Sequence, residues 1–248
     1  MQLAHAGDPA GIDGSGLLYD DFIECWDRRS SVVVVHYPPD QPLDYRQLAE
    51  HAWDQLPPEG PLALIGESFS GPVSIILAAR LGKRARGLIL CCSFCKSPHA
   101  MLKRLPLALL PIPNRPERWI SRLVLGPFAT RALEDQLALA LKPLTTAVIR
   151  ARFAALSRID QGALLAQLKI PILYLQASFD TLVWRQSARE VARLAPQTRF
   201  RRLKGAHFLL QSNPSDCVQA IAKFYSRLEF ESRCGQPDGF PDPGNCHD

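Results

Sequence analysis

The stretch LIGESFSGP at residues 64–72 decides the fold. Its apolar first half has the pattern of a buried strand, and the apolar residues that follow, to about Leu81, have the pattern of a helix. A serine at the tip of the turn between them holds its hydroxyl away from the backbone, provided that the residues two before and two after it are small. Gly66 and Ser70 meet that requirement around Ser68. The stretch therefore predicts a sharp turn that presents the Ser68 hydroxyl at the end of a buried strand.

Strand and helix patterns alternate on both sides of this turn. We expect the other strands at 32–35, 87–92, 171–176 and 198–203. We expect the other helices at 43–56, 187–194 and 215–228. This alternation predicts an α/β fold: a mostly parallel, doubly wound sheet with helices on both faces. Residues 1–9 carry no apolar strand pattern, which leaves open that the N-terminal strands of the sheet are missing.

A long segment without a strand pattern separates the third and fourth strands. Prolines interrupt its first half, and its second half has helical spacing. We therefore expect a helical cap insertion at 97–168, a core made of 1–96 and 169–230, and a disordered tail at 231–248 that is rich in Pro, Gly and Asp. The apolar cap residues either line a pocket for an acyl chain or pack the cap onto the sheet: Leu102, Leu105, Leu107, Leu109, Leu110, Ile112, Trp119 and Leu123.

Composition excludes several classes of protein. The 248 residues are 47% hydrophobic and 21% charged, which is too apolar for a disordered chain. The net charge of +5 is mild, and no basic run with interleaved aromatic residues predicts nucleic-acid binding. The longest apolar runs fall short of the roughly 20 residues that span a bilayer. The start, MQLAHA, lacks the basic and apolar parts of a signal peptide, so we expect a cytoplasmic protein without a transmembrane segment.

Seven cysteines are an odd number and do not suggest a disulfide framework. Zinc binding by Cys91, Cys92, Cys95 and His99 is disfavoured, because neighbouring residues on a strand point to opposite faces of the sheet. We interpret these thiols as buried and unreactive, and we expect no metal site.

Two downstream segments complete a recognisable pattern. The segment ILYLQASFDTLV at 172–183 places Asp180 just after a strand, and LKGAHF at 203–208 places His207 just after the next. With GESFSG, these segments resemble the α/β-hydrolase family of lipase- and esterase-like serine hydrolases, whose chain order is Ser, Asp or Glu, then His. The resemblance covers about residues 10–228. It implies that Ser68 is the nucleophile, His207 its general base and Asp180 the acid that orients the base.

The same resemblance implies an oxyanion hole. The backbone N–H of Phe69, which follows the nucleophile, is the first expected donor. The segment AGIDGSG at 10–16 is similar to the family's glycine-rich loop and implies the Ile12 N–H as the second donor, although a plain glycine-rich turn remains the alternative. Asp160 competes with Asp180 for the acid but belongs to the insertion, and His36 follows a strand and could line the mouth of the site.

The function implied is hydrolysis of a carboxylic ester or thioester, with an apolar acyl chain, without a metal or organic cofactor. The partner is then a small-molecule ester or lipid-like substrate; ten basic against four acidic residues over 97–160 also suit peripheral contact with an anionic membrane. One alternative is an acyltransferase with the same triad, since GIDG with GESFSG resembles plastid phytyl-ester-forming acyltransferases. The other is a non-catalytic binding protein of the same fold. Dehalogenases are disfavoured because they have an aspartate where this chain has Ser68. The oligomeric state is not predicted.

Overall fold

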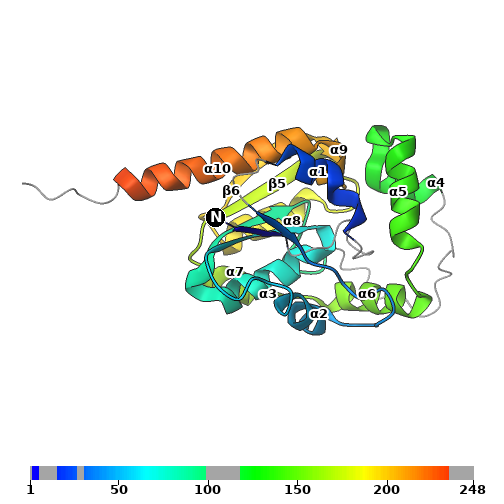
Figure 1. Ribbon diagram of the computed structural model, residues 1–248, viewed down its shortest axis with the longest axis horizontal. Helices are drawn as coiled ribbons and strands as arrows, with labels where there is room; N and C mark the ends of the chain where they lie inside the picture. The colour runs from blue at the N-terminus through cyan, green and yellow to red at the C-terminus, as the bar shows by residue number, and fades with distance from the viewer. Residues whose placement is uncertain (1, 6–15, 27–30, 99–117, 235–248) are drawn as a thin grey trace, which may run out of the picture.

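The computed structural model describes residues 2–5, 16–26, 31–98 and 118–234 (Figure 1). Six parallel strands form one sheet in the order β2-β1-β3-β4-β5-β6. Their bounds are β1 Gln2–His5, β2 Val32–Val34, β3 Leu62–Glu67, β4 Ala85–Cys91, β5 Ile172–Phe179 and β6 Arg199–Ala206. The predicted parallel sheet is therefore confirmed.

The expectation that N-terminal strands are missing is wrong for one strand. Gln2–His5 forms β1, which lies inside the sheet and pairs in parallel with both β2 and β3. Backbone hydrogen bonds to two neighbours hold a strand of four residues that carries too few apolar residues to show a sequence pattern.

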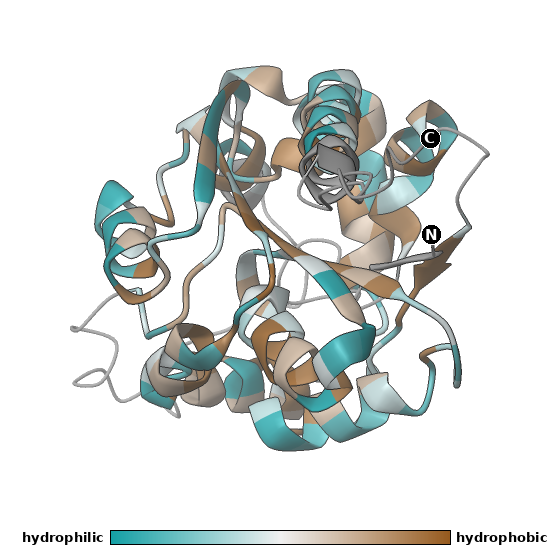
Figure 2. Ribbon diagram, turned by 90° about the vertical axis from the view of Figure 1, so that its left-hand side faces the viewer, coloured by the Kyte–Doolittle hydropathy of each residue, from teal (hydrophilic) through white to brown (hydrophobic). Residues whose placement is uncertain are grey.

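Helices cover both faces of the sheet, as Figure 1 shows. One face carries α2 Tyr45–Trp53, α3 Gly71–Leu81, α7 Gly162–Gln167 and α8 Arg185–Leu194. The other carries α1 Asp20–Cys25, α9 Leu209–Ser212 and α10 Pro214–Cys234. Alternate residues of β4 pack into the two cores, Leu88 and Leu90 with the first group and Ile89 and Cys91 with the second. Figure 2 shows the hydrophobic colour concentrated in the central strands and the inner turns of the helices.

The described part of the segment between β4 and β5 is mostly helical from residue 118 onward. It contains α4 Arg118–Leu125, the 3₁₀ turn η6 Gly126–Phe128, α5 Arg131–Leu141, α6 Thr146–Arg158 and α7. Helices α4 and α5 stand beyond one end of the sheet (Figure 1), whereas α7 packs with α3 and α8 on its face. Most of the apolar residues proposed for the cap, Leu102 to Ile112, lie outside the described residues, and Leu123 is 40% exposed.

Helix α10 continues to Cys234, four residues into the segment expected to be a disordered tail. The rest of that tail lies outside the described residues. Within the described ranges, none of the helices combines the length and the apolar character that crossing a bilayer requires.

Candidate active site

The turn after β3 has the geometry that the sequence predicts. Ser68 adopts a positive φ of 48°, a left-handed conformation that is strained for a residue with a side chain. A Cβ added at Gly66 would lie 2.5 Å from Ser74 Oγ and 2.7 Å from Gly71 Cα, so strand and helix approach too closely for a larger residue. The strained turn and the close approach hold Ser68 at the end of β3.

Hydroxyl groups reinforce this turn. Ser70 stands where the family pattern has glycine, and its Oγ donates to the Glu67 carbonyl at 2.8 Å. Ser93, two residues after β4, donates to the Ser68 carbonyl at 2.6 Å. The serine at position 70 is thus accommodated because its hydroxyl has a partner inside the turn.

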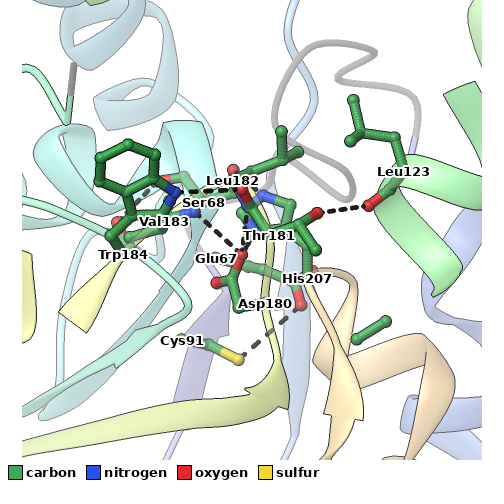
Figure 3. Close-up of polar contacts among 12 residues, drawn as sticks. Glu67, Ser68, Cys91, Leu123, Asp180, Thr181, Leu182, Val183, Trp184 and His207 are labelled. Carbon is green, nitrogen blue, oxygen red and sulfur yellow. Dashed lines mark hydrogen bonds and ion pairs between the residues drawn. The ribbon is translucent and has the colours of Figure 1, made fainter.

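The structure brings the three predicted triad residues together (Figure 3). Ser68 Oγ lies 2.7 Å from His207 Nε2, and His207 Nδ1 lies 2.9 Å from Asp180 Oδ1. The three residues follow β3, β5 and β6, whose carboxyl ends meet at one edge of the sheet. The Asp180 and His207 side chains are each only 3% exposed. A serine, an imidazole and a carboxylate in this chain of hydrogen bonds can transfer a proton away from the serine.

The loop after β5 prepares the Asp180 carboxylate to accept. The backbone N–H groups of Leu182 and Val183 each donate to Asp180 Oδ1 at 2.9 Å. Burial raises the pKa of Asp180, but attraction to His207 and the hydrogen bonds to the carboxylate outweigh burial, so the pKa is lowered. An ionised Asp180 can accept the proton of His207 Nδ1, and in that tautomer Nε2 is free to accept from Ser68.

Of the two expected oxyanion donors, only Phe69 lies in the part of the chain that the structure describes. Phe69 lies in the first helical turn after the nucleophile, where backbone N–H groups have no partner within the helix, and its ring stacks on Tyr45 at 4.5 Å. Ile12 lies outside the described residues. Gly16, at the end of the same glycine-rich segment, has a φ of 77° and sits against the His36 ring, where a Cβ would come within 2.4 Å.

The competing acid Asp160 does not join the site. It lies 3.6 Å from Lys96 Nζ, and its side chain is 61% exposed. The structure therefore brings Asp180, and not Asp160, to His207.

A sequence model of the serine aminopeptidase (S33) family matches residues 41–209, which is more than half of the chain and includes the positions of Ser68, Asp180 and His207. The chain belongs to this family of α/β hydrolases. No curated protein matches the sequence.

Solved structures show the same fold. A hydrolase from Pseudomonas aeruginosa superposes with a TM-score of 0.75 at 19% identity, covering 90% of this chain and 89% of its own. A lipase-esterase related protein from Clostridium acetobutylicum gives 0.68 at 14% identity, covering 90% and 93%. An enol-lactonase from Burkholderia xenovorans gives 0.64 at 17% identity, covering 91% of each chain. At these identities the likeness establishes the α/β-hydrolase fold alone.

One site residue of this hydrolase escaped the sequence analysis. Glu67 is 0% exposed and lies next to Ser68, and its carboxylate accepts hydrogen bonds from distant parts of the chain. The available signal was an acidic residue at the end of an otherwise apolar strand, where a buried charge needs partners.

The three cysteines at and just after the end of β4 are buried thiols. Cys91, Cys92 and Cys95 are free and at most 1% exposed. Burial raises the pKa of all three, that of Cys95 to about 11, so they remain protonated near neutral pH and are poor nucleophiles. The part of the chain that the structure describes contains no cluster of His, Cys, Asp and Glu suited to a metal ion.

Proposed function

We propose that this α/β hydrolase cleaves carboxylic esters or thioesters through an acyl-enzyme on Ser68. The single observation that carries the proposal is the hydrogen-bonded chain from Ser68 Oγ to His207 and on to Asp180, with distances of 2.7 Å and 2.9 Å. Such a chain, on a strained turn at the start of a helix, activates a serine for attack on an acyl carbon.

The reaction proceeds in two halves. Ser68 Oγ attacks the acyl carbon while His207 Nε2 takes the hydroxyl proton, and the Phe69 N–H stabilises the negative oxygen. The bond to the leaving alcohol or thiol then breaks, and His207 returns the proton to that group. Water attacks the acyl-enzyme with His207 again as base, which releases the carboxylic acid and restores Ser68. Throughout, Asp180 stabilises the imidazolium that forms.

Among the described residues, the two carboxylates next to Ser68 and His207 are already hydrogen-bonded within the protein, which favours esters over the aminopeptidase substrates that the family's description names. A peptide with a free amino terminus brings an ammonium group, which a carboxylate near the nucleophile would bind. Asp180 is buried and bonded to His207 and its own loop, and Glu67 is buried and accepts from internal donors. Neither of these two carboxylates is available to a substrate ammonium.

The helices beyond the sheet pack onto the loops that carry Asp180 and His207. We propose that α4 and α5 form a cap over the site. An apolar cluster joins Leu125 and Leu137 of these helices to Phe208, next to His207, and to Leu182 in the Asp180 loop. Two backbone carbonyls at the end of α4 also accept hydrogen bonds from the loops that carry Asp180 and His207. The Leu123 carbonyl accepts from Thr181 Oγ1 at 3.1 Å, and the Val124 carbonyl accepts from the Phe208 N–H at 3.1 Å.

Hydrolysis of p-nitrophenyl esters, from acetate to palmitate, tests the proposal on the wild type and on Ser68→Ala. Ser226→Ala, at an exposed serine of α10, is the matched control. We expect turnover by the wild type and the control and only background hydrolysis by Ser68→Ala. Turnover that survives Ser68→Ala would show that Ser68 is not the nucleophile.

Two further arms address the alternatives from the sequence. A long-chain alcohol added to the assay yields a new ester if the protein is an acyltransferase, and only the acid if it is a hydrolase. An aminoacyl p-nitroanilide tests the aminopeptidase activity. A wild type that neither hydrolyses any ester nor reacts with a fluorophosphonate would indicate a binding protein and would overturn the proposal.

A further inference from the structure

Glu67 occupies an unusual place for an acidic residue. It is the last residue of β3, directly before Ser68, and none of its surface is exposed. Along β3, Ala63 and Ile65 pack into the core beneath α1, α9 and α10, and the alternation of the strand turns Glu67 to the same side. A carboxylate in that position is costly unless hydrogen bonds replace its lost water.

The carboxylate receives those hydrogen bonds from four donors. On Oε2, Tyr19 Oη donates at 3.0 Å and Gln211 Nε2 at 2.9 Å. On Oε1, the backbone N–H of Leu210 donates at 3.1 Å and Cys91 Sγ at 3.8 Å (Figure 3 shows the Cys91 contact). Four donors match the four lone-pair sites of an ionised carboxylate.

The donors belong to three separate segments of the chain. Leu210 and Gln211 lie in α9, three and four residues after His207. Tyr19 ends the short 3₁₀ turn that follows Gly16, the last residue of the segment with the expected oxyanion donor, and its own N–H donates to the Gly16 carbonyl at 3.3 Å. Cys91 ends β4. Because Glu67 is bonded covalently to Ser68, one side chain ties the nucleophile to all of these segments.

We propose that Glu67 is a positioning residue, which fixes the His207 loop and the end of the glycine-rich segment relative to Ser68 through its four accepted hydrogen bonds. This inference rests on the proposed function. It assigns Glu67 no contact with substrate and no proton transfer: its carboxylate holds the loop that carries the base and the 3₁₀ turn that follows Gly16.

The pKa of Glu67 is raised above its ordinary value, because burial outweighs the effect of the donors around the carboxylate. The hydrogen bonds from Gln211, Leu210 and Tyr19 and attraction to His207 act in the opposite direction to burial. Burial also raises the pKa of the Cys91 thiol well above its usual range, so the thiol keeps the proton that it donates.

Two substitutions separate the contacts of Glu67 from its charge. Glu67→Met fills a similar volume and removes both acceptor oxygens. Glu67→Gln removes the charge, but all four contacts can survive: the Tyr19 hydroxyl can rotate to accept, and Gln211 can turn over its amide, because its Oε1 is buried without a hydrogen-bond partner. A role through contacts predicts that Glu67→Gln rescues what Glu67→Met loses.

The experiment measures kcat and KM for the preferred p-nitrophenyl ester in both variants and in Tyr19→Phe. We expect kcat to fall about 100-fold in Glu67→Met, as for a catalytic group displaced by about 1 Å, with little change in KM. Glu67→Gln should regain most of kcat, and Tyr19→Phe should fall between. Tyr225→Phe is the matched control: it removes another buried tyrosine hydroxyl from the same core, one without a hydrogen-bond partner. Wild-type kcat in Glu67→Met, or an equal loss in Glu67→Gln, would overturn the proposal.

A second readout does not depend on activity. The Nδ1 proton of His207, held against Asp180, gives a low-field proton NMR resonance that is lost when the imidazole leaves its position. We expect this resonance in the wild type, Glu67→Gln and Tyr225→Phe, and its weakening in Tyr19→Phe and loss in Glu67→Met. Should Glu67→Met fail to fold, Tyr19→Phe decides: an unchanged resonance and unchanged kcat overturn the inference. A wild type that shows the resonance but hydrolyses no ester would contradict the proposed function and leave the positioning result readable.

Discussion

Two buried carboxylates lie on either side of the serine–histidine pair, and their surroundings differ. Asp180 accepts from His207 and from two N–H groups of its own loop, all on Oδ1, and its pKa is lowered although burial acts to raise it. Glu67 accepts from donors far away in the sequence, and burial raises its pKa despite them. The Asp180 carboxylate, whose donors lie in its own loop and on His207, is readily ionised next to that base. The Glu67 carboxylate, buried directly before the nucleophile in the chain, is instead proposed to hold distant segments together.

Removing the charge of Asp180 should have the largest effect. Asp180→Asn keeps the size of the side chain but no longer fixes the proton on His207 Nδ1, so we expect kcat for ester hydrolysis to fall by about 10⁴-fold. Asp160→Asn, the same change at the exposed competitor on the insertion, should leave kcat at the wild-type level. If both variants kept wild-type kcat, Asp180 would not be the orienting acid.

The second-largest expected effect is that the two carboxylates change the stability of the fold with pH in opposite directions. The pKa of Asp180 is lower in the folded protein than in the unfolded protein. The carboxylate therefore stabilises the fold at pH values above its unfolded pKa, and this contribution is lost as the pH falls through its folded pKa. The pKa of Glu67 is shifted in the opposite direction, upward. Its contribution to stability is therefore largest at pH values below its ordinary pKa of 4.5, and it is lost as the pH rises through the raised pKa.

Urea denaturation over a pH series measures both contributions. The stability of the wild type relative to Asp180→Asn should decrease on acidification, and its stability relative to Glu67→Gln should decrease as the pH rises. Parallel pH dependence in the two comparisons would show that the two environments do not differ as described.

The smallest effect is expected at the weakest donor to Glu67. The Cys91 thiol is a weak donor at 3.8 Å, and the other three donors remain in Cys91→Ala. We expect a smaller loss of kcat in Cys91→Ala than in Tyr19→Phe. Cys95→Ala, at a buried thiol of the core on the other face of the sheet, controls for the lost sulfur volume. A larger loss in Cys91→Ala than in Tyr19→Phe would contradict the ranking of the contacts.

The sequence predicted the fold and the residues that meet at the site because each signal is local. Ser68, Asp180 and His207 each follow a strand pattern, and parallel strands bring their carboxyl ends to one edge. The signals for β1 and Glu67 are not local. Strand β1 is held by pairing with β2 and β3, and the partners of Glu67 lie 24 to 144 residues away. The hydrophobic periodicity of a sequence does not predict contacts between residues this far apart in the chain.

The most direct test of the central claim is to map the adduct of a fluorophosphonate by peptide mass spectrometry. The account predicts one adduct, on Ser68, formed rapidly by the wild type and far more slowly by His207→Ala. An adduct on another serine, or equal rates in the two proteins, would contradict the assignment of Ser68 as a nucleophile activated by His207.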